Sequence, residues 1–245
     1  MIKIIKNILR PYKIKLKMLK AYFIRKKNKD INHNFKCNKD TKRCFNNKYS
    51  PNYMYEYFGD NTPICCATNL YKILKDVTKV LERHNLEYFI SFGTLLGAVR
   101  HGGLIPWDTD TDIIIPHSQK EKYFDVLKKE LTQYDIKDTK EKDVVGSVIR
   151  VYLSKVNTLH VDLFTFLEDN EKIIFGFDRK FDKKEIYPLQ KIPFYDSKLF
   201  APKNIDKHLK NLYGKDYMEY AYKQWALDKS KFKIDNYSPA KIEIK

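Results

Sequence analysis

The most constraining feature of the sequence is a row of alternating aspartates that leads into an apolar segment. Asp108, Asp110 and Asp112 precede the three isoleucines at 113–115, and Pro116 follows them. Side chains of a β-strand alternate with a period of two, so the three carboxylates are expected on one side of a buried strand. Like charges at close range repel unless a cation lies between them. Because every ligand would be an oxygen, the pattern predicts a hard ion, Mg²⁺ or Mn²⁺.

A fourth acid stands alone in a second apolar segment. Asp162 is flanked by Val161, Leu163 and Phe164, which are typical of a buried strand. A buried carboxylate without a partner is costly, and a metal ion shared with Asp110 and Asp112 would supply one. The alternative is an edge position from which Asp162 faces solvent.

Gly93 and Thr94 lie between an expected strand and the start of an expected helix. Gly93 has no Cβ, so a phosphate can approach the backbone there. The free N–H groups of the helix start attract anions, and the Thr94 hydroxyl can donate to a phosphate oxygen. Many turns of this kind bind nothing, but this one comes shortly before the acidic row. The two residues are therefore predicted to bind phosphate.

Three further side chains lie between these features. Arg100 is a candidate for a bidentate phosphate contact, and His101 for proton transfer or substrate orientation. Trp107 is a candidate for stacking on a base or sugar. Each has an alternative structural role: a helix C-terminal charge for Arg100, a loop side chain for His101 and packing of the loop for Trp107.

The hydrophobic pattern predicts an α+β fold with a mixed sheet and packed helices. Helices are expected over 67–84, from Gly93 through Arg100, from a cap at Ser118 to about 131, and over 203–213 before Gly214. Strands are expected over 87–92, 111–115, 144–153, 159–167 and 173–177, the last in a hairpin after 168–170.

Charge divides the chain of 245 residues into two parts. The net charge is +16, and residues 1–50 hold 16 Lys and Arg but only two acids. We therefore expect a basic arm over 1–62, containing an amphipathic helix, and a nearly neutral catalytic domain over 63–245. The arm suits an anionic surface such as a membrane, through residues 1–27, or packs on its own domain. Binding of nucleic acid is not expected, because the body lacks excess positive charge.

Sequence features also bear on location. The longest nearly apolar run, 88–99, is shorter than the roughly 20 residues that a membrane span needs, and lysines interrupt the N-terminus. We expect a cytoplasmic protein, peripheral to a membrane if the arm binds one. The spacing of Cys37, Cys44, Cys65 and Cys66 favours reduced thiols over a zinc site.

The motifs together resemble a known superfamily. A Gly-Thr before a helix, alternating acids and a later acid on a strand resemble the nucleotidyltransferase (polymerase-β-like) fold. Within it, FGTLLGAVRHGGLIPWDTDTDI at 92–113 closely resembles the signature of the LicD and fukutin-related family. Further matching segments are VDLF at 161–164, YPL at 187–189, Phe194, APKN at 201–204 and LYG at 212–214.

The resemblance implies an enzyme that transfers a phosphorylated alcohol, such as phosphocholine or ribitol phosphate, from a CDP-linked donor to a glycan acceptor. Carried over by resemblance, Asp108, Asp110, Asp112 and Asp162 hold Mg²⁺ against the donor diphosphate. Its phosphates would lie against Gly93, Thr94 and Arg100. The resemblance also implies that Asp110 or Asp162 accepts the proton of the acceptor hydroxyl. Two alternatives stay open: a nucleotidyltransferase acting on nucleic acid or a small molecule, and a non-catalytic scaffold of the same fold.

Overall fold

The computed structural model describes residues 36–42, 62–139, 148–176, 179–222 and 231–243, together with Tyr12 and Leu16. The arm expected over 1–62, and with it the membrane contact through 1–27, therefore lies largely outside the described residues. Tyr12 and Leu16 are helical, and their side chains are 70% and 60% exposed.

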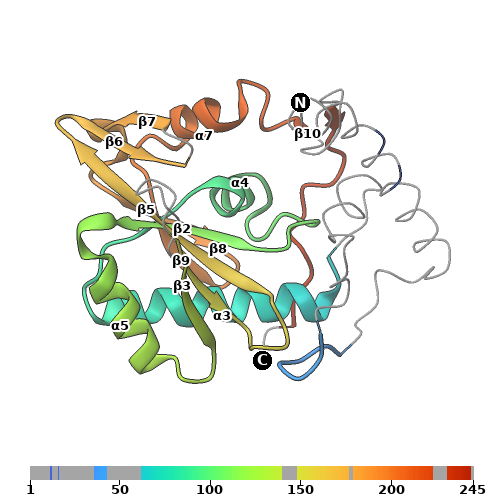
Figure 1. Ribbon diagram of the computed structural model, residues 1–245. Helices are drawn as coiled ribbons and strands as arrows, with labels where there is room; N and C mark the ends of the chain where they lie inside the picture. The colour runs from blue at the N-terminus through green and yellow to red at the C-terminus, as the bar shows by residue number, and fades with distance from the viewer. Residues whose placement is uncertain are drawn as a thin grey trace.

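The longest described helix follows directly from its apolar spacing. Helix α3 (Ile64–Arg83) buries a stripe that includes Leu70, Ile73, Leu74 and Val77, each without exposed surface. The helix ends at His84, as the sequence predicts to within a residue. It forms the base on which the sheet rests, and it is the long horizontal helix of Figure 1.

A mixed sheet forms the centre of the molecule. Its main path runs β1-β2-β5-β4-β3, and β6 and β7 extend it from β5. Strands β2 and β5 are parallel, while the other described pairs of this sheet are antiparallel. The strands are β1 (Phe89–Ile90), β2 (Thr111–Pro116), β3 (Asp135–Thr139), β4 (Val148–Tyr152), β5 (His160–Asp169), β6 (Lys172–Phe175) and β7 (Arg179–Asp182).

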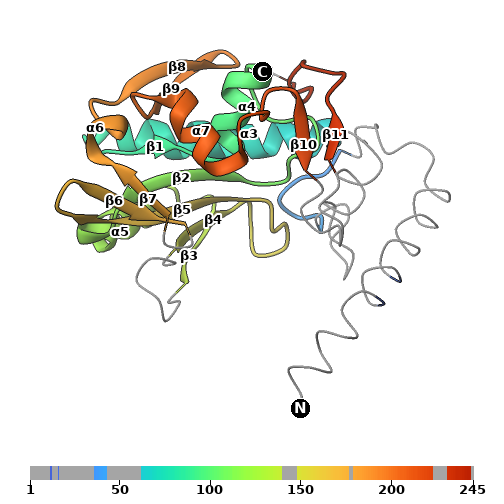
Figure 2. The ribbon, with the colours of Figure 1, turned by 90° about the horizontal axis from the view of Figure 1, so that it is seen from above.

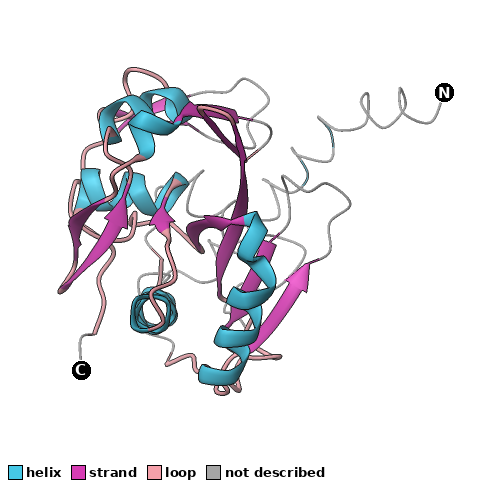
Figure 3. Cartoon of the chain, turned by 90° about the vertical axis from the view of Figure 1, so that its left-hand side faces the viewer, coloured by secondary structure: helices cyan, strands magenta, loops and turns pink. Residues whose placement is uncertain are grey.

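Helices cover both faces of this sheet. Helix α3 and helix α5 (Lys120–Glu130), which follows the short 3₁₀ helix η1 (His117–Gln119), lie below it in Figure 1. Helices α4 (Phe92–His101) and α7 (Ile205–Tyr213) lie above it. Figure 3, which views α3 along its axis, shows the strands curving between these two groups. The side chains of each strand therefore alternate between two differently covered faces.

The C-terminal part adds small elements around this frame. Helix α6 (Lys183–Ile186) leads to the hairpin of β8 (Gln190–Phe194) and β9 (Ser197–Ala201), which lies across β2 from β3 and β4 (Figure 2). Strands β10 (Tyr220–Tyr222) and β11 (Lys231–Lys233) form a separate pair. Asn204 caps α7 by accepting a hydrogen bond from the Lys207 N–H at 3.1 Å, and Gly214 ends the helix as predicted.

The structure corrects several details. Ser118 does not cap the helix, because it lies inside η1 and α5 starts two residues later. Strand β2 starts at Thr111 as predicted, so Asp108 and Asp110 precede it. Cys37 is disulfide-bonded, so the expectation of reduced thiols is wrong there, while Cys65 and Cys66 are buried and keep their reduced thiols. In the portion of the chain that the structure describes, no helix combines the length and the apolar character that crossing a bilayer requires.

Candidate active site

The predicted acids gather at the N-terminal end of β2. Asp112 lies directly opposite Asp162 in the parallel pairing of β2 with β5, so the two side chains leave the same face of the sheet. Asp108 and Asp110 are brought to this point by the turn before β2. Burial raises the pKa of Asp112 well above its usual range, and the charges of Asp110, Asp108 and Asp162 raise it further. The four carboxylates therefore form one electrostatic group.

The start of α4 holds this group from above. The backbone N–H of Gly93 donates to the Asp112 carboxylate and works to lower its pKa. A Cβ at Gly93 would lie 2.8 Å from Oδ2 of Asp108, so the glycine is required for this approach. The Thr94 hydroxyl oxygen accepts a hydrogen bond of 2.7 Å from the Asp112 N–H. Gly93 and Thr94 thus position the acids, and their contact with a phosphate stays a prediction.

An aromatic cluster fixes the entry into α4. Phe92 has a φ of +46°, which side-chain-bearing residues rarely adopt. Its ring packs against Phe164 and Phe175 with centroid separations of 5.5 and 5.8 Å. A Cβ at Gly176 would lie 2.5 Å from the tip of the Phe92 ring, so the ring is tightly enclosed. This packing holds the strained turn that presents the Gly93 amide to Asp112.

Asp162 has basic partners that the sequence did not suggest. Arg150 of β4 donates from Nε to Oδ1 at 2.7 Å and from Nη2 to Oδ2 at 3.3 Å. Nε2 of His160 lies 3.6 Å from Oδ2. Burial alone would raise the pKa of Asp162, but His160 and Arg150 hold it below the usual value. The period of a strand would have placed His160 beside Asp162, two residues along β5, whereas the position of Arg150 depends on the register of β4.

Arg100, His101 and Trp107 form a group at the C-terminal end of α4, where the charge of Asp108 still acts on the Arg100 guanidinium. The Arg100 guanidinium is buried, and it donates to His101 Nε2 at 2.9 Å and to the Tyr217 carbonyl at 2.8 Å. The central carbon Cζ of this guanidinium lies 5.9 Å from the Trp107 ring centre. Burial lowers the pKa of His101 to about 4, and the Arg100 charge adds to this. In this conformation Arg100 is turned into the protein, so a phosphate contact would require it to move.

Helix α7 contributes a neighbour that the sequence marked only through its LYG match. Tyr213 lies near the acids: burial raises the pKa of its hydroxyl, and the charges of Asp112 and Asp108 raise it further. The phenol therefore stays protonated and can donate a hydrogen bond.

The donor chemistry of the group fits a hard cation. All four acids offer carboxylate oxygens, and the pKa of Asp112 is raised by burial and then by the neighbouring negative charges, both of which a divalent ion would offset. Within the described ranges, however, no three His, Cys, Asp or Glu side chains are already drawn together around a metal position. Binding would require the carboxylates to converge and Asp162 to loosen its contact with Arg150.

Known proteins match this chain over the part that contains the acidic group. The family model for the LicD/FKTN/FKRP nucleotidyltransferase domain matches residues 85–204. Human ribitol 5-phosphate transferase FKRP is 33% identical over 195 residues, covering 76% of this chain and 39% of the human protein. The Haemophilus influenzae lipopolysaccharide cholinephosphotransferase LicD is 37% identical over 60 residues, covering 24% of this chain and 23% of that protein. The chain thus spans well under half the length of these two relatives.

Among solved structures, the lincosamide antibiotic adenylyltransferase LnuA aligns with a TM-score of 0.41 and 16% identity. The alignment covers 58% of this chain and 84% of that protein. The matched segment 85–204 contains the start of α4, the acidic row and Asp162. The α+β architecture with a mixed sheet is as predicted. Residues 85–204 of this chain are a nucleotidyltransferase domain of the LicD/FKTN/FKRP family.

Proposed function

We propose that the chain is a Mg²⁺-dependent transferase that moves a phosphorylated alcohol from a CDP-linked donor to a glycan acceptor. The observation that supports this most directly is the pairing of Asp112 with Asp162 across β2 and β5 beneath the N-terminus of α4. A diphosphate is a polyanion, and it can approach these carboxylates only with a cation between them. The relatives named above transfer ribitol 5-phosphate and phosphocholine according to their names.

In this proposal Asp108, Asp110, Asp112 and Asp162 would hold the ion. When bound, the metal would stabilise negative charge on the donor diphosphate. Arg150 would turn from Asp162 towards a phosphate oxygen, since its side chain is 32% exposed whereas that of Asp162 is 5% exposed. The Gly93 amide would keep Asp112 oriented, and the Tyr213 hydroxyl would donate to a carboxylate or to the substrate.

The reaction would be a displacement at phosphorus. The acceptor hydroxyl oxygen bonds to the phosphorus next to the alcohol, and the bond from that phosphorus to the bridging oxygen breaks. CMP leaves with the electron pair of that bond. The hydroxyl proton passes to a carboxylate, for which Asp110 is a better candidate than Asp162, because His160 stays beside Asp162 and works to lower its pKa, which weakens that carboxylate as a base.

A donor screen tests the proposal. Purified protein is incubated with CDP-ribitol, CDP-choline or CDP-glycerol, a glycan acceptor and Mg²⁺ or Mn²⁺, and CMP release is measured. We expect release from at least one donor, abolished by a chelator and by Asp110→Ala. Asp125→Asn is the matched control, because Asp125 is exposed on α5 at the opposite face. Turnover of nucleoside triphosphates without CMP release from any CDP-linked compound would favour the nucleotidyltransferase alternative instead.

A further inference from the structure

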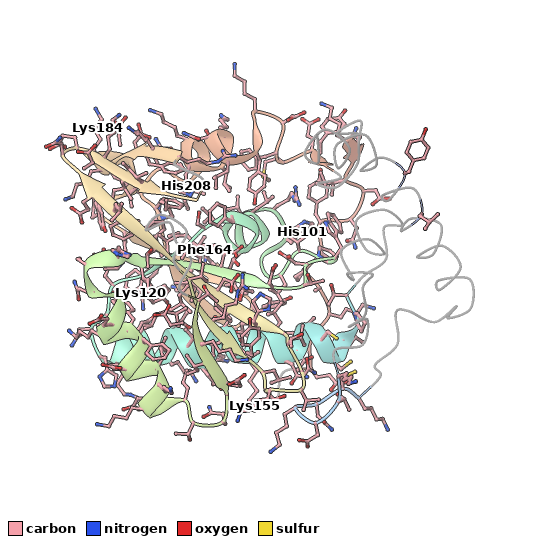
Figure 4. All side chains as sticks on the ribbon, viewed as in Figure 1. His101, Lys120, Lys155, Phe164, Lys184 and His208 are labelled. Atoms are coloured by element: carbon pink, nitrogen blue, oxygen red, sulfur yellow. The ribbon has the colours of Figure 1, made fainter. Side chains whose placement is uncertain are left out.

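A cavity lies beside Asp162 on the acid-bearing face of the sheet. Its volume is about 300 Å³, at the lower end of the range of roughly 300–1,000 Å³ that small-molecule sites occupy. The lining side chains used below are Asp135, Lys137, Tyr152, Ser154, Lys155 and His160. Figure 4 labels Lys155 near the β4–β5 connection and Phe164 further along β5. The cavity is therefore at the end of the sheet where β5 begins.

Strand register joins this cavity to the acids. Across β2, β5, β4 and β3, one row of opposed residues is Asp112, Asp162, Arg150 and Lys137. The neighbouring row on the same face runs through His160, Tyr152 and Asp135. His160 belongs to the cavity wall, and its Nε2 lies 3.6 Å from Oδ2 of Asp162. A molecule in the cavity would be separated from Asp162 by one imidazole ring.

The wall combines cations, hydroxyls and an aromatic face. Lys137 and Lys155 are exposed, and the Lys137 ammonium lies 5.3 Å from the Tyr152 ring centre. The Tyr152 ring also packs against His160 at 5.3 Å. Asp135 is the acid of the lining, and it pairs with Lys137 at 3.1 Å. Ammonium groups bind phosphate, and aromatic faces pack on the C–H surface of a sugar. Together they suit a phosphorylated sugar or sugar alcohol.

The wall that carries Lys155 is held in place. Ser154 Oγ accepts hydrogen bonds from the Val156 N–H at 3.1 Å and the Asn157 N–H at 2.8 Å, and it donates to the Lys39 carbonyl. Asn157 is buried, and its Nδ2 donates to the Asn38 carbonyl at 2.9 Å. Segment 36–42 therefore fixes the β4–β5 connection that carries Lys155.

The two sides of Asp162 differ in what they can accept. On the β2 side, the acids and the start of α4 form the proposed donor site. On the β4 and β3 side lie the cationic cavity and Arg150. We propose that this cavity binds a phosphorylated sugar or sugar-alcohol unit of the acceptor, with its phosphate between Lys137 and Lys155 and its carbon face on Tyr152. This inference rests on the proposed function, because it supplies the second substrate of that reaction.

Direct binding tests the cavity without turnover. Ribitol 5-phosphate, ribitol and inorganic phosphate are titrated into the full chain by calorimetry. We expect ribitol 5-phosphate to bind more tightly than either fragment, and Lys137→Ala/Lys155→Ala to weaken it about tenfold or more, the size expected for charge-assisted contacts. Lys122→Ala/Lys129→Ala, on the exposed side of α5, should leave the affinity unchanged. No binding to the native chain, or equal affinity in both double variants, would overturn the proposal.

Two further measurements decide whether the cavity binds a phosphate of the acceptor or of the donor. CMP affinity should be equal in the native chain and in Lys137→Ala/Lys155→Ala, and a parallel loss of CMP affinity would assign the cavity to the donor and overturn our assignment. In a transfer assay the double variant should raise the acceptor KM and leave the donor KM unchanged. Absence of turnover in the native chain would count against the proposed function alone, because the titrations judge the cavity independently.

Discussion

Arg150 forms a two-point contact with Asp162, with Nε 2.7 Å from Oδ1 and Nη2 3.3 Å from Oδ2. The two residues are directly opposed on β4 and β5. Every oxygen of this carboxylate therefore has a cationic partner before any metal arrives. A divalent ion at the proposed site would compete with Arg150 for Asp162, and this competition would link the stability of the domain to its proposed activity.

Removal of Arg150 should destabilise the domain. Arg150→Ala leaves the buried Asp162 charge with His160 alone, and we expect a loss of about 2 kcal/mol in the free energy of unfolding, less than for a fully buried pair because Arg150 is partly exposed. Urea denaturation at pH 7 measures it. Lys191→Ala breaks an exposed pair with Glu82 and should cost under about 0.5 kcal/mol. Equal effects in both variants would refute the structural role of Arg150.

Asp112→Asn should stabilise the metal-free domain at neutral pH. The pKa of Asp112 is raised in the folded state, so between its unfolded and folded pKa the native state binds more protons, and stability falls as pH rises through this window. The amide removes this penalty, with an expected gain of about 1 kcal/mol. Thermal unfolding at pH 5 and pH 8 checks it. The gain should be larger at pH 8, and a loss at both values would contradict the proposed repulsion.

Addition of Mg²⁺ should make the native chain more stable than Asp112→Asn. If Mg²⁺ binds the native acids, the melting temperature of the native chain rises with concentration, with about 2.7 kcal/mol gained at 100 times Kd. Asp110→Asn and Asp112→Asn should lose the response, while Asp125→Asn should keep it. The measurement is thermal unfolding across a Mg²⁺ series at constant ionic strength. A response that survives in Asp110→Asn and Asp112→Asn would place the ion elsewhere.

Gly93→Ala should displace Asp108. The added methyl would lie 2.8 Å from Oδ2 of Asp108, so this carboxylate must move. We expect CMP release to fall at least about tenfold, because misplaced catalytic groups are costly, with the fold retained in circular dichroism. Adding Asp108→Ala should recover part of the lost stability, since the clash is gone, but none of the activity. Full activity in Gly93→Ala would show that Asp108 need not stay where it is.

His208 should make the domain acid-sensitive. Burial lowers its pKa to about 3, and its Nε2 lies 2.8 Å from the Ser91 hydroxyl. Between pH 6.5 and 3 the unfolded state binds the extra proton, so stability is full above pH 6.5 and falls as pH drops, by up to about 1.4 kcal/mol per pH unit. His208→Phe keeps the stacking on Phe181 and should show a shallower loss in urea unfolding at pH 4 to 7. If the free energy of unfolding of the native chain and of His208→Phe fell equally with pH, His208 would not be the source of the acid sensitivity.

Much of the fold could be predicted because its local signals are strong. Helix α3 and the β5–β6 hairpin follow from apolar periodicity and from the turn at Asn170, and α7 ends at its glycine. Strands β3 and β8 were missed, because their exposed lysines leave little alternation and tertiary pairing decides their structure.

The candidate site was predicted only in part. The pattern Asp-Thr-Asp-Thr-Asp predicted the acidic group, but strand geometry reaches only Asp112, and the turn before β2 positions Asp108 and Asp110. Arg150 was missed because a salt bridge across β4 and β5 depends on register, which a single strand does not reveal. His160 lies two residues before Asp162 on the same face of β5, so its place could have been predicted from the period of a strand. The inward turn of Arg100 depends on a contact with Tyr217, distant in sequence.

The parallel pairing of β2 with β5 has a consequence for how the protein matures. Because α5, β3 and β4 all lie between Asp112 and Asp162 along the chain, a polypeptide synthesised or folded only as far as β2 holds three of the four acids and lacks Asp162. The intervening crossover must close before Asp162 joins the other three. Binding of the proposed ion would therefore come at the end of folding. A polypeptide that lacks Asp162 would neither bind the ion nor consume a nucleotide-linked donor without transferring it.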